Sequence, residues 1–160
     1  MKKVNLKDIG EVERKSPKGK YCAYSKEVSV ALGRVDGATD LNLRHPFDVT
    51  VTRLPKGAAR CPYHAHSAQW ELYVVISGKG KVRDENGWTE VGPGDAFLFK
   101  PMEAHTIANA GEEELVYFVV ADNPVREWCH YPDSGKFIMR DEPKNRVVRV
   151  EGAEYFEGEE

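Results

Sequence analysis

Short segments in which apolar and polar residues alternate recur along most of the chain, with turn residues between them. The alternation indicates strands, because successive side chains of a strand point to opposite faces. Asn86-Gly87 separates two such segments and is a strong hairpin signal. So many short antiparallel strands predict an all-β protein, a two-sheet sandwich or a jelly-roll barrel that encloses an interior. The expected strands are residues 27–34, 47–54, 64–66, 69–77, 80–84, 88–91, 96–99, 105–108 and 115–121.

The chain has the length of one domain with an extension at each end. Its 160 residues are enough to bury a core, and no internal repeat indicates two tandem barrels. We place the barrel at residues 27–122. Residues 1–26, polar and rich in lysine, are expected to form an N-terminal arm or edge strand. Residues 123–160 are expected to form a C-terminal arm, with short strands at 136–140 and 146–150 that pack on the barrel.

Composition argues against several classes of partner. A formal net charge of -3 with 31% charged residues provides no basic stripe for a nucleic acid. No apolar run approaches a membrane span, and the N-terminal residues lack the apolar core of a signal peptide, so we expect a cytoplasmic protein without membrane contact. Cys22, Cys61 and Cys129 form no CxxC pair and are expected to be free thiols in a reducing compartment.

Three histidines and a glutamate are candidates for one metal site. His64 and His66 belong to one expected strand, two positions apart, so their imidazoles point to the same face. Glu71 lies in the next expected strand and His105 in a later one, and inward side chains of a barrel can meet. Imidazoles and a carboxylate suit a divalent ion such as Fe, Mn, Zn, Ni or Co. Four such ligands leave one or two positions of the ion open for a small molecule.

Tyr73 is the expected pocket residue beside this set. It follows Glu71 by two positions and so shares its strand face, whereas Trp70 and Leu72 lie on the other face. Glu71 and Tyr73 are therefore the candidate catalytic residues, and either could act as a base. Gln69 lies between the expected ligands, where it either supports the pocket or packs the sheet.

Two glycine-flanked motifs contain the candidate ligands. The first reads Gly57-x6-His64-x-His66-x4-Glu71-x6-Gly78, and the second reads Gly94-Asp95-x5-Pro101-x3-His105-x3-Asn109. Together they resemble the two motifs of the cupin superfamily, over roughly residues 47–121. The gap between Gly57 and His64 is one residue longer than the usual pattern, and Glu103 stands where glycine is common. Both departures fall in expected loops, so the ligands on strands are retained.

The resemblance carries its own expectations. It implies a double-stranded β-helix, the jelly-roll cupin barrel, with a divalent metal ion held by His64, His66, Glu71 and His105. Among cupins the chain looks most like small single-domain bacterial proteins with a Cupin_2-like barrel. Single-barrel cupins commonly pair through edge strands or exchanged N-terminal arms, and residues 20–35 have strand character suited to this. The resemblance therefore implies a homodimer.

Three hypotheses on function follow, and two of them are enzymatic. The first is a metal-dependent oxygenase, such as a dioxygenase, that acts on a small organic acid or enol. The second is a sugar or sugar-phosphate isomerase or epimerase, an activity of some cupins that resemble this chain. The third is a non-catalytic module that binds or senses a small ligand. All three place a small molecule in the barrel, and the residues alone do not decide whether the chain is an enzyme.

Overall fold

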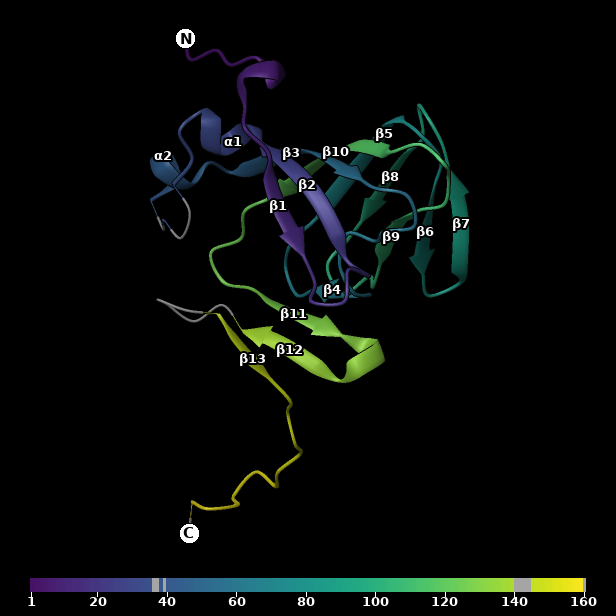
Figure 1. Cartoon of the computed structure of the whole chain (residues 1–160). Coiled ribbons are helices and arrows are strands. Elements are labelled where there is room, and N and C mark those ends of the chain that lie inside the picture. Colours follow the sequence, from purple (N-terminus) through teal and green to yellow (C-terminus); the bar gives the residue numbers. More distant parts are fainter. Residues whose placement is uncertain (36–37, 39, 140–144, 160) are drawn as a thin grey trace.

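The structure, a computed structural model, describes residues 1–35, 38, 40–139 and 145–159 (Figure 1). The all-β prediction is confirmed: the described residues form three sheets and a few helices of at most four residues. None of the helices among the described residues is long and apolar enough to cross a membrane. The strands are β1 Val12–Lys15, β2 Cys22–Glu27, β3 Phe47–Leu54, β4 Ala65–His66, β5 Glu71–Ser77, β6 Gly80–Asp84, β7 Gly87–Val91, β8 Ala96–Phe99, β9 Thr106–Asn109, β10 Leu115–Asp122, β11 Trp128–Tyr131, β12 Lys136–Met139 and β13 Arg146–Val148. The helices are η1 Leu6–Asp8, α1 Val28–Ala31, α2 Leu41–Arg44 and η2 Pro132–Ser134.

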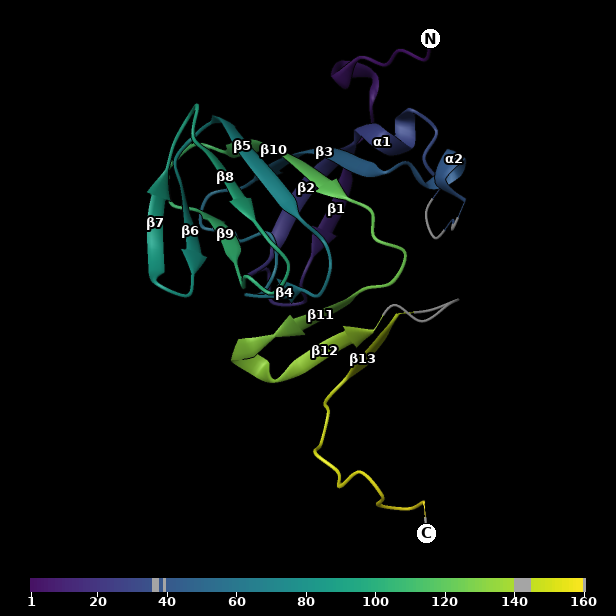
Figure 2. The ribbon, with the colours of Figure 1, turned by 180° about the vertical axis from the view of Figure 1, so that it is seen from behind.

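Two of the sheets form the walls of a barrel. A six-stranded antiparallel sheet, in the order β1-β2-β3-β10-β5-β8, makes the larger wall. A three-stranded sheet, in the order β7-β6-β9, makes the smaller wall, which Figure 2 shows from behind. Strands that are consecutive in the sequence are often not adjacent in a sheet. For example, β10 lies between β3 and β5 and pairs with both, which is the crossing connectivity of a jelly roll.

The core lies between these two walls. Leu115 and Tyr117 alternate along β10 and are fully buried, because the period-two side chains of one face turn toward the opposite sheet. Val82 of β6 and Ile107 of β9 meet them from the smaller wall in one hydrophobic cluster. Each such side chain contributes about 1.5–3 kcal/mol when it leaves water. This burial holds the strands that carry the candidate ligands.

Gly78 ends the first motif in the turn after β5. Its φ of 84° lies in the left-handed region. A Cβ at this position would collide with the backbone carbonyl of Glu114. Glycine is therefore required where β5 leaves its pairing with β10, and Glu71 sits at the opposite end of the same strand.

The C-terminal arm forms a further layer at one end of the barrel. β11 pairs antiparallel with β4, so that Cys129 lies opposite His66. β11, β12 and β13 then form a small antiparallel sheet beside β4, away from α1 and α2 (Figures 1 and 2). The strands expected at 136–140 and 146–150 correspond to β12 and β13, with residue 140 outside the described residues. β11 was not predicted, whereas β1 is an edge strand within residues 1–26, where an arm or edge strand was expected.

The prediction of a strand at residues 27–34 is wrong. β2 ends at Glu27, and the next four residues form α1. Buried Ser29 fixes this turn, because its Oγ accepts a hydrogen bond of 2.8 Å from the backbone N–H of Val49. A contact with a distant strand thus overrides the strand preference of the alternating valines in this segment.

Candidate metal centre

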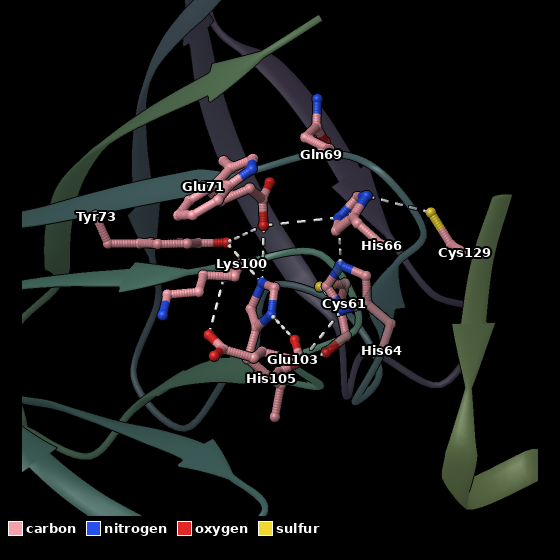
Figure 3. A network of polar contacts seen from close by, with 12 residues as sticks. Cys61, His64, His66, Gln69, Glu71, Tyr73, Lys100, Glu103, His105 and Cys129 are labelled. Carbon is pink, nitrogen blue, oxygen red and sulfur yellow. Dashed lines mark hydrogen bonds and ion pairs between the residues drawn. The ribbon is translucent and has the colours of Figure 1, made fainter. Parts of the chain in front are cut away.

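Strand pairing brings the predicted ligands to one place in the barrel. His64 and His66 flank Ala65 at β4, and Glu71 is the first residue of β5. His105 precedes β9 and forms an antiparallel bridge with His64, with backbone N–H to O distances of 3.0 and 2.8 Å. In Figure 3 these side chains point toward one another from three backbone segments.

The polar atoms of the four side chains are in close contact. His64 Nε2 lies 3.1 Å from His66 Nε2, and His105 Nε2 lies 2.8 Å from Glu71 Oε2. Glu71 Oε2 is also 3.6 Å from His66 Nε2, which places this oxygen between two rings (Figure 3). The three histidines are at most 8% exposed. Their interactions are therefore weakly screened by water.

Backbone carbonyls assign the tautomer of two of these histidines. The Nδ1–H of His64 donates to the carbonyl oxygen of Pro62 at 3.0 Å. The Nδ1–H of His105 donates in the same way to the carbonyl oxygen of Glu103 at 3.1 Å. Because a carbonyl oxygen can only accept, the proton is assigned to Nδ1, and the lone pair of Nε2 faces the cluster.

This set of atoms fits a divalent metal ion. When all three imidazoles are neutral, their lone pairs and the carboxylate face one another, which is unfavourable in a buried site unless a cation lies among them. Ligands at right angles, each about 2.1 Å from one ion, are about 3.0 Å apart, and the observed separations are 2.8–3.6 Å. His64, His66 and Glu71 form a group, with ligand atoms within 4.8 Å of one another, that could hold the ion. His105 contacts this group through Glu71.

Two of the groups already have the charge state that a metal requires. Burial lowers the pKa of His64 to about 4, and the imidazoles of His105 and His66 add to this effect. Burial raises the pKa of Glu71, but the contact with His105 and the other imidazoles outweigh burial and hold that pKa at about 2. At neutral pH, His64 is therefore neutral and Glu71 ionised, as metal ligands must be.

Tyr73 reaches the same cluster from β5. Its hydroxyl donates a hydrogen bond of 2.9 Å to Glu71 Oε2 and lies 3.4 Å from His105 Nε2. Burial, and then the charge of Glu71, raise the pKa of Tyr73 well above its usual value. Tyr73 is therefore a protonated hydrogen-bond donor at neutral pH, beside the expected ligands.

Aromatic side chains form the wall next to His105 and Tyr73. Phe99 stacks on the His105 ring, with centroids 4.0 Å apart and planes 2° from parallel. Phe97 stacks on Tyr73 at 5.2 Å, and Tyr117 approaches the same ring at 5.7 Å. The sequence left open whether the two phenylalanines line the interior or pack the sheets, and both contact residues of the cluster. The Tyr117 hydroxyl is buried and has no hydrogen-bond partner among the described residues.

The C-terminal arm adds residues that sequence reasoning missed. Glu127 Oε1 lies 2.8 Å from His66 Nδ1, and Cys129 Sγ lies 3.4 Å from the same atom. Tyr131 stacks over His64 with ring centroids 5.8 Å apart. Burial lowers the pKa of His66, but the contacts with Cys129 and Glu127 raise it to about 10. The sequence gives little sign of this, since Glu127 belongs to neither motif and reaches His66 only through the β4–β11 pairing.

The support expected from Gln69 takes a defined form. Its backbone N–H donates to Glu127 Oε1 at 3.2 Å, and its side-chain amide donates to the carbonyl oxygen of Asp122 at 2.6 Å. Gln69 is 7% exposed. It therefore ties the segment between β4 and β5 to the start of the C-terminal arm.

Proteins of known sequence share this domain. The family model of the cupin domain named Cupin_2 matches residues 50–121. A curated relative, the oxalate-binding protein of Thermotoga maritima, is 28% identical over 68 residues. That match covers 42% of this chain and 55% of the relative, so the chain spans little more than half the relative's length.

Solved structures extend the likeness over most of the chain. A candidate sugar phosphate isomerase from Acidithiobacillus ferrooxidans has a TM-score of 0.78 at 21% identity, covering 93% of this chain and 92% of the other. A cupin-superfamily sugar phosphate isomerase from Silicibacter pomeroyi has a TM-score of 0.77 at 23% identity, covering 92% of each chain. At such identities the likeness establishes the fold alone. Residues 50–121 thus match the cupin domain, and the chain as a whole has the fold of these cupin-like structures.

Proposed function

We propose that this cupin is a metal-dependent isomerase of a sugar phosphate. The observation that carries the proposal is the hydrogen bond of 2.9 Å from the Tyr73 hydroxyl to Glu71 Oε2, next to His105. It places a proton donor and a carboxylate beside a set of atoms that fits a divalent ion. Isomerisation of an aldose to a ketose needs these parts, because protons move between neighbouring carbons and between their oxygens.

Each residue has a role in this proposal. His64, His66, Glu71 and His105 would hold the ion, which when bound polarises the carbonyl group of the sugar. Tyr73 Oη donates its proton to the substrate oxygen that gains negative charge and takes a proton back in the second half of the reaction. Glu71, the carboxylate in contact with Tyr73, accepts the proton that leaves one sugar carbon and returns a proton to the neighbouring carbon, which regenerates the carboxylate. The aromatic wall of half-buried Phe97 and buried Phe99 limits the access of water.

Lys100 is the residue to which we assign contact with the phosphate group. It directly follows β8 and carries an exposed side chain, which in Figure 3 begins beside the cluster and extends away from the histidines. The residue before it, Phe99, is the last of β8 and packs on His105. By contrast, the Arg53 guanidinium already pairs with Glu11 and Glu114. An exposed ammonium group one residue beyond Phe99 is suited to a phosphate as a point charge.

The comparisons support the isomerase hypothesis more than the oxygenase hypothesis. The sugar phosphate isomerase and the candidate sugar phosphate isomerase both align with this chain over at least 92% of its length. An oxygenase acting on a small organic acid or enol remains a prediction. One experiment distinguishes the two hypotheses, because an isomerase turns over without O2 and an oxygenase does not.

The test is an assay of the metal-loaded protein with aldose and ketose phosphates under anaerobic conditions in D2O. The protein is loaded in turn with Mn, Fe, Co, Ni or Zn, and NMR follows both the sugar and deuterium at its carbons. We expect interconversion of at least one pair, with solvent deuterium at the carbon that exchanges. No interconversion with any ion, or turnover that requires O2, would overturn the proposal.

A second candidate is binding of a small dicarboxylate at the same centre. The observation that favours it is the match to the oxalate-binding protein of Thermotoga maritima. A dicarboxylate can fill two open positions of one ion. Calorimetric titration of oxalate into metal-loaded and metal-free protein tests it, and binding that is equal in both forms would exclude this role.

The expected homodimer also remains a prediction. β1 is an edge strand with exposed side chains, and among the strands that the structure describes it pairs only with β2. Such an edge offers unpaired backbone groups to a second copy. Light scattering at several concentrations tests it, and a monomeric mass at all of them would refute it.

A further inference from the structure

Glu127 is a buried carboxylate in the segment that joins β10 to β11, outside both cupin motifs. Its side chain is 0% exposed. Oε1 accepts a hydrogen bond of 2.8 Å from His66 Nδ1 and another of 3.2 Å from the backbone N–H of Gln69. A buried carboxylate is costly unless it is well paired. Here that pairing is made to an expected metal ligand.

The position of Glu127 is fixed by the pairing of the arm with the ligand strand. The backbone N–H of Ser67 donates to the carbonyl oxygen of Trp128 at 2.9 Å. The backbone N–H of Trp128 returns a bond of 2.9 Å to Ser67 Oγ. These two bonds join the residue after His66 to the residue after Glu127. Glu127 is therefore held against His66 by backbone geometry rather than by its own flexible side chain.

The contact determines which ring nitrogen of His66 faces the cluster. A carboxylate only accepts hydrogen bonds, so the proton of a neutral His66 ring is placed on Nδ1, toward Glu127. The lone pair of Nε2 then points to Glu71 and His64, as in the other two histidines. Cys129 Sγ, at 3.4 Å, is a weaker acceptor for the same nitrogen.

We propose that Glu127 is a positioning residue of the metal centre: it fixes the ring orientation and the Nδ1-protonated tautomer of His66, and so makes metal affinity depend on the C-terminal arm. The inference rests on the metal centre of the proposed function. His64 and His105 donate to neutral carbonyl oxygens, whereas His66 donates to a charged one. A negatively charged acceptor makes the ring a stronger ligand. His66 is thus the expected ligand whose orientation and tautomer depend on the arm.

The first test measures the affinity of Zn²⁺ by competition with a chelating dye. Glu127→Gln keeps the shape of the side chain and an acceptor for the Gln69 N–H but removes the charge. We expect an affinity lower by about 10- to 100-fold. The matched control is Asp133→Asn, which removes the arm's ion pair with Arg83 without touching a ligand. It should change the affinity less than twofold.

The second test reads the tautomer directly, from ¹⁵N spectra of histidine-labelled protein with and without Zn²⁺. We expect the wild-type His66 to carry its proton on Nδ1, shifted by a strong hydrogen bond, and this shift to fall in Glu127→Gln. In the Zn²⁺-bound wild type, coordination through Nδ1 with the proton on Nε2 would overturn the inference, and this readout needs no variant.

The outcomes separate this inference from the proposed function. If the wild type binds Zn²⁺ and Glu127→Gln binds it equally well, the positioning role fails and the centre stands. If Asp133→Asn weakens binding as much as Glu127→Gln, the arm acts only as a structural support, which also contradicts the role. If the wild type binds no divalent ion, both ideas fail.

Discussion

The barrel and the C-terminal arm contact opposite sides of the same imidazole. On the barrel side, His66 Nε2 faces Glu71 and His64. On the arm side, His66 Nδ1 faces Glu127 and Cys129. The barrel supplies atoms that fit an ion directly, whereas the arm supplies atoms that orient one of the ligands. The residues around this centre therefore come from two sources. The expected ligands belong to the cupin motifs of the barrel, whereas the residues that orient His66 belong to an arm without a motif.

The largest expected effect lies on the barrel side. Glu71→Gln removes the carboxylate that contacts His66, His105 and Tyr73. Loss of a ligand should exceed the loss of an outer contact, so we expect metal affinity to fall by more than about 100-fold. Competition with a chelating dye measures it. If Glu71→Gln binds the metal no more weakly than Glu127→Gln does, the barrel does not supply the ligands while the arm only orients one of them.

A second variant sharpens the division within the barrel. Tyr73→Phe removes the hydroxyl that donates to Glu71 but leaves every expected ligand in place. We expect kcat of sugar-phosphate isomerisation to fall by about 10²- to 10⁴-fold, the usual contribution of a positioned acid or base. Metal affinity should stay within a few-fold of wild type. A normal kcat would remove Tyr73 from the proposed mechanism.

The pH dependence of the metal-free protein follows from the barrel cluster. The pKa of His64 is about 4 in the folded chain and 6.5 in its unperturbed state, so the unfolded chain binds more protons between these values. Stability is therefore present above pH 6.5 and is lost as the pH falls toward 4. Melting temperatures from pH 8 to 4 measure this loss. His64→Gln should flatten the profile, and an unchanged slope in that variant would assign the loss to other groups.

The smallest effect belongs to the outer face of the arm. Asp133 and Arg83 form an exposed ion pair that joins η2 to β6. Exposed pairs contribute little, and Asp133→Asn should lower the melting temperature by at most about 3 °C at neutral pH. The hydrogen bond from Arg83 lowers the pKa of Asp133, so this small contribution is lost only in strong acid. A drop larger than that of a ligand variant would show that the arm, not the barrel, limits stability.

What the sequence predicts also differs between the two regions. In the barrel, local patterns suffice: the expected strands 47–54, 80–84 and 96–99 match β3, β6 and β8 residue for residue. The HxH spacing predicts the shared direction of His64 and His66 from strand geometry alone. Such predictions depend on residues a few positions apart.

In the arm, the decisive contacts are not local. Glu127 and His66 are 61 residues apart and meet only because β11 pairs with β4. No periodicity in the segment 123–135 encodes that pairing. A non-local contact also explains the wrong strand prediction at residues 27–34. There the hydrogen bond from the Val49 N–H to Ser29 Oγ stabilises a helical turn instead. Sequence patterns predict which faces are buried, but not which distant strand they meet.

The most direct test of the account is the metal content of protein prepared without a metal-binding affinity tag and reconstituted with each candidate ion. Elemental analysis gives the number of ions per chain for the wild type, His66→Ala and His105→Ala. The account predicts about one ion per chain in the wild type and almost none in either variant. An empty wild type, or variants that retain the ion in full, would contradict the metal centre on which the proposed function depends.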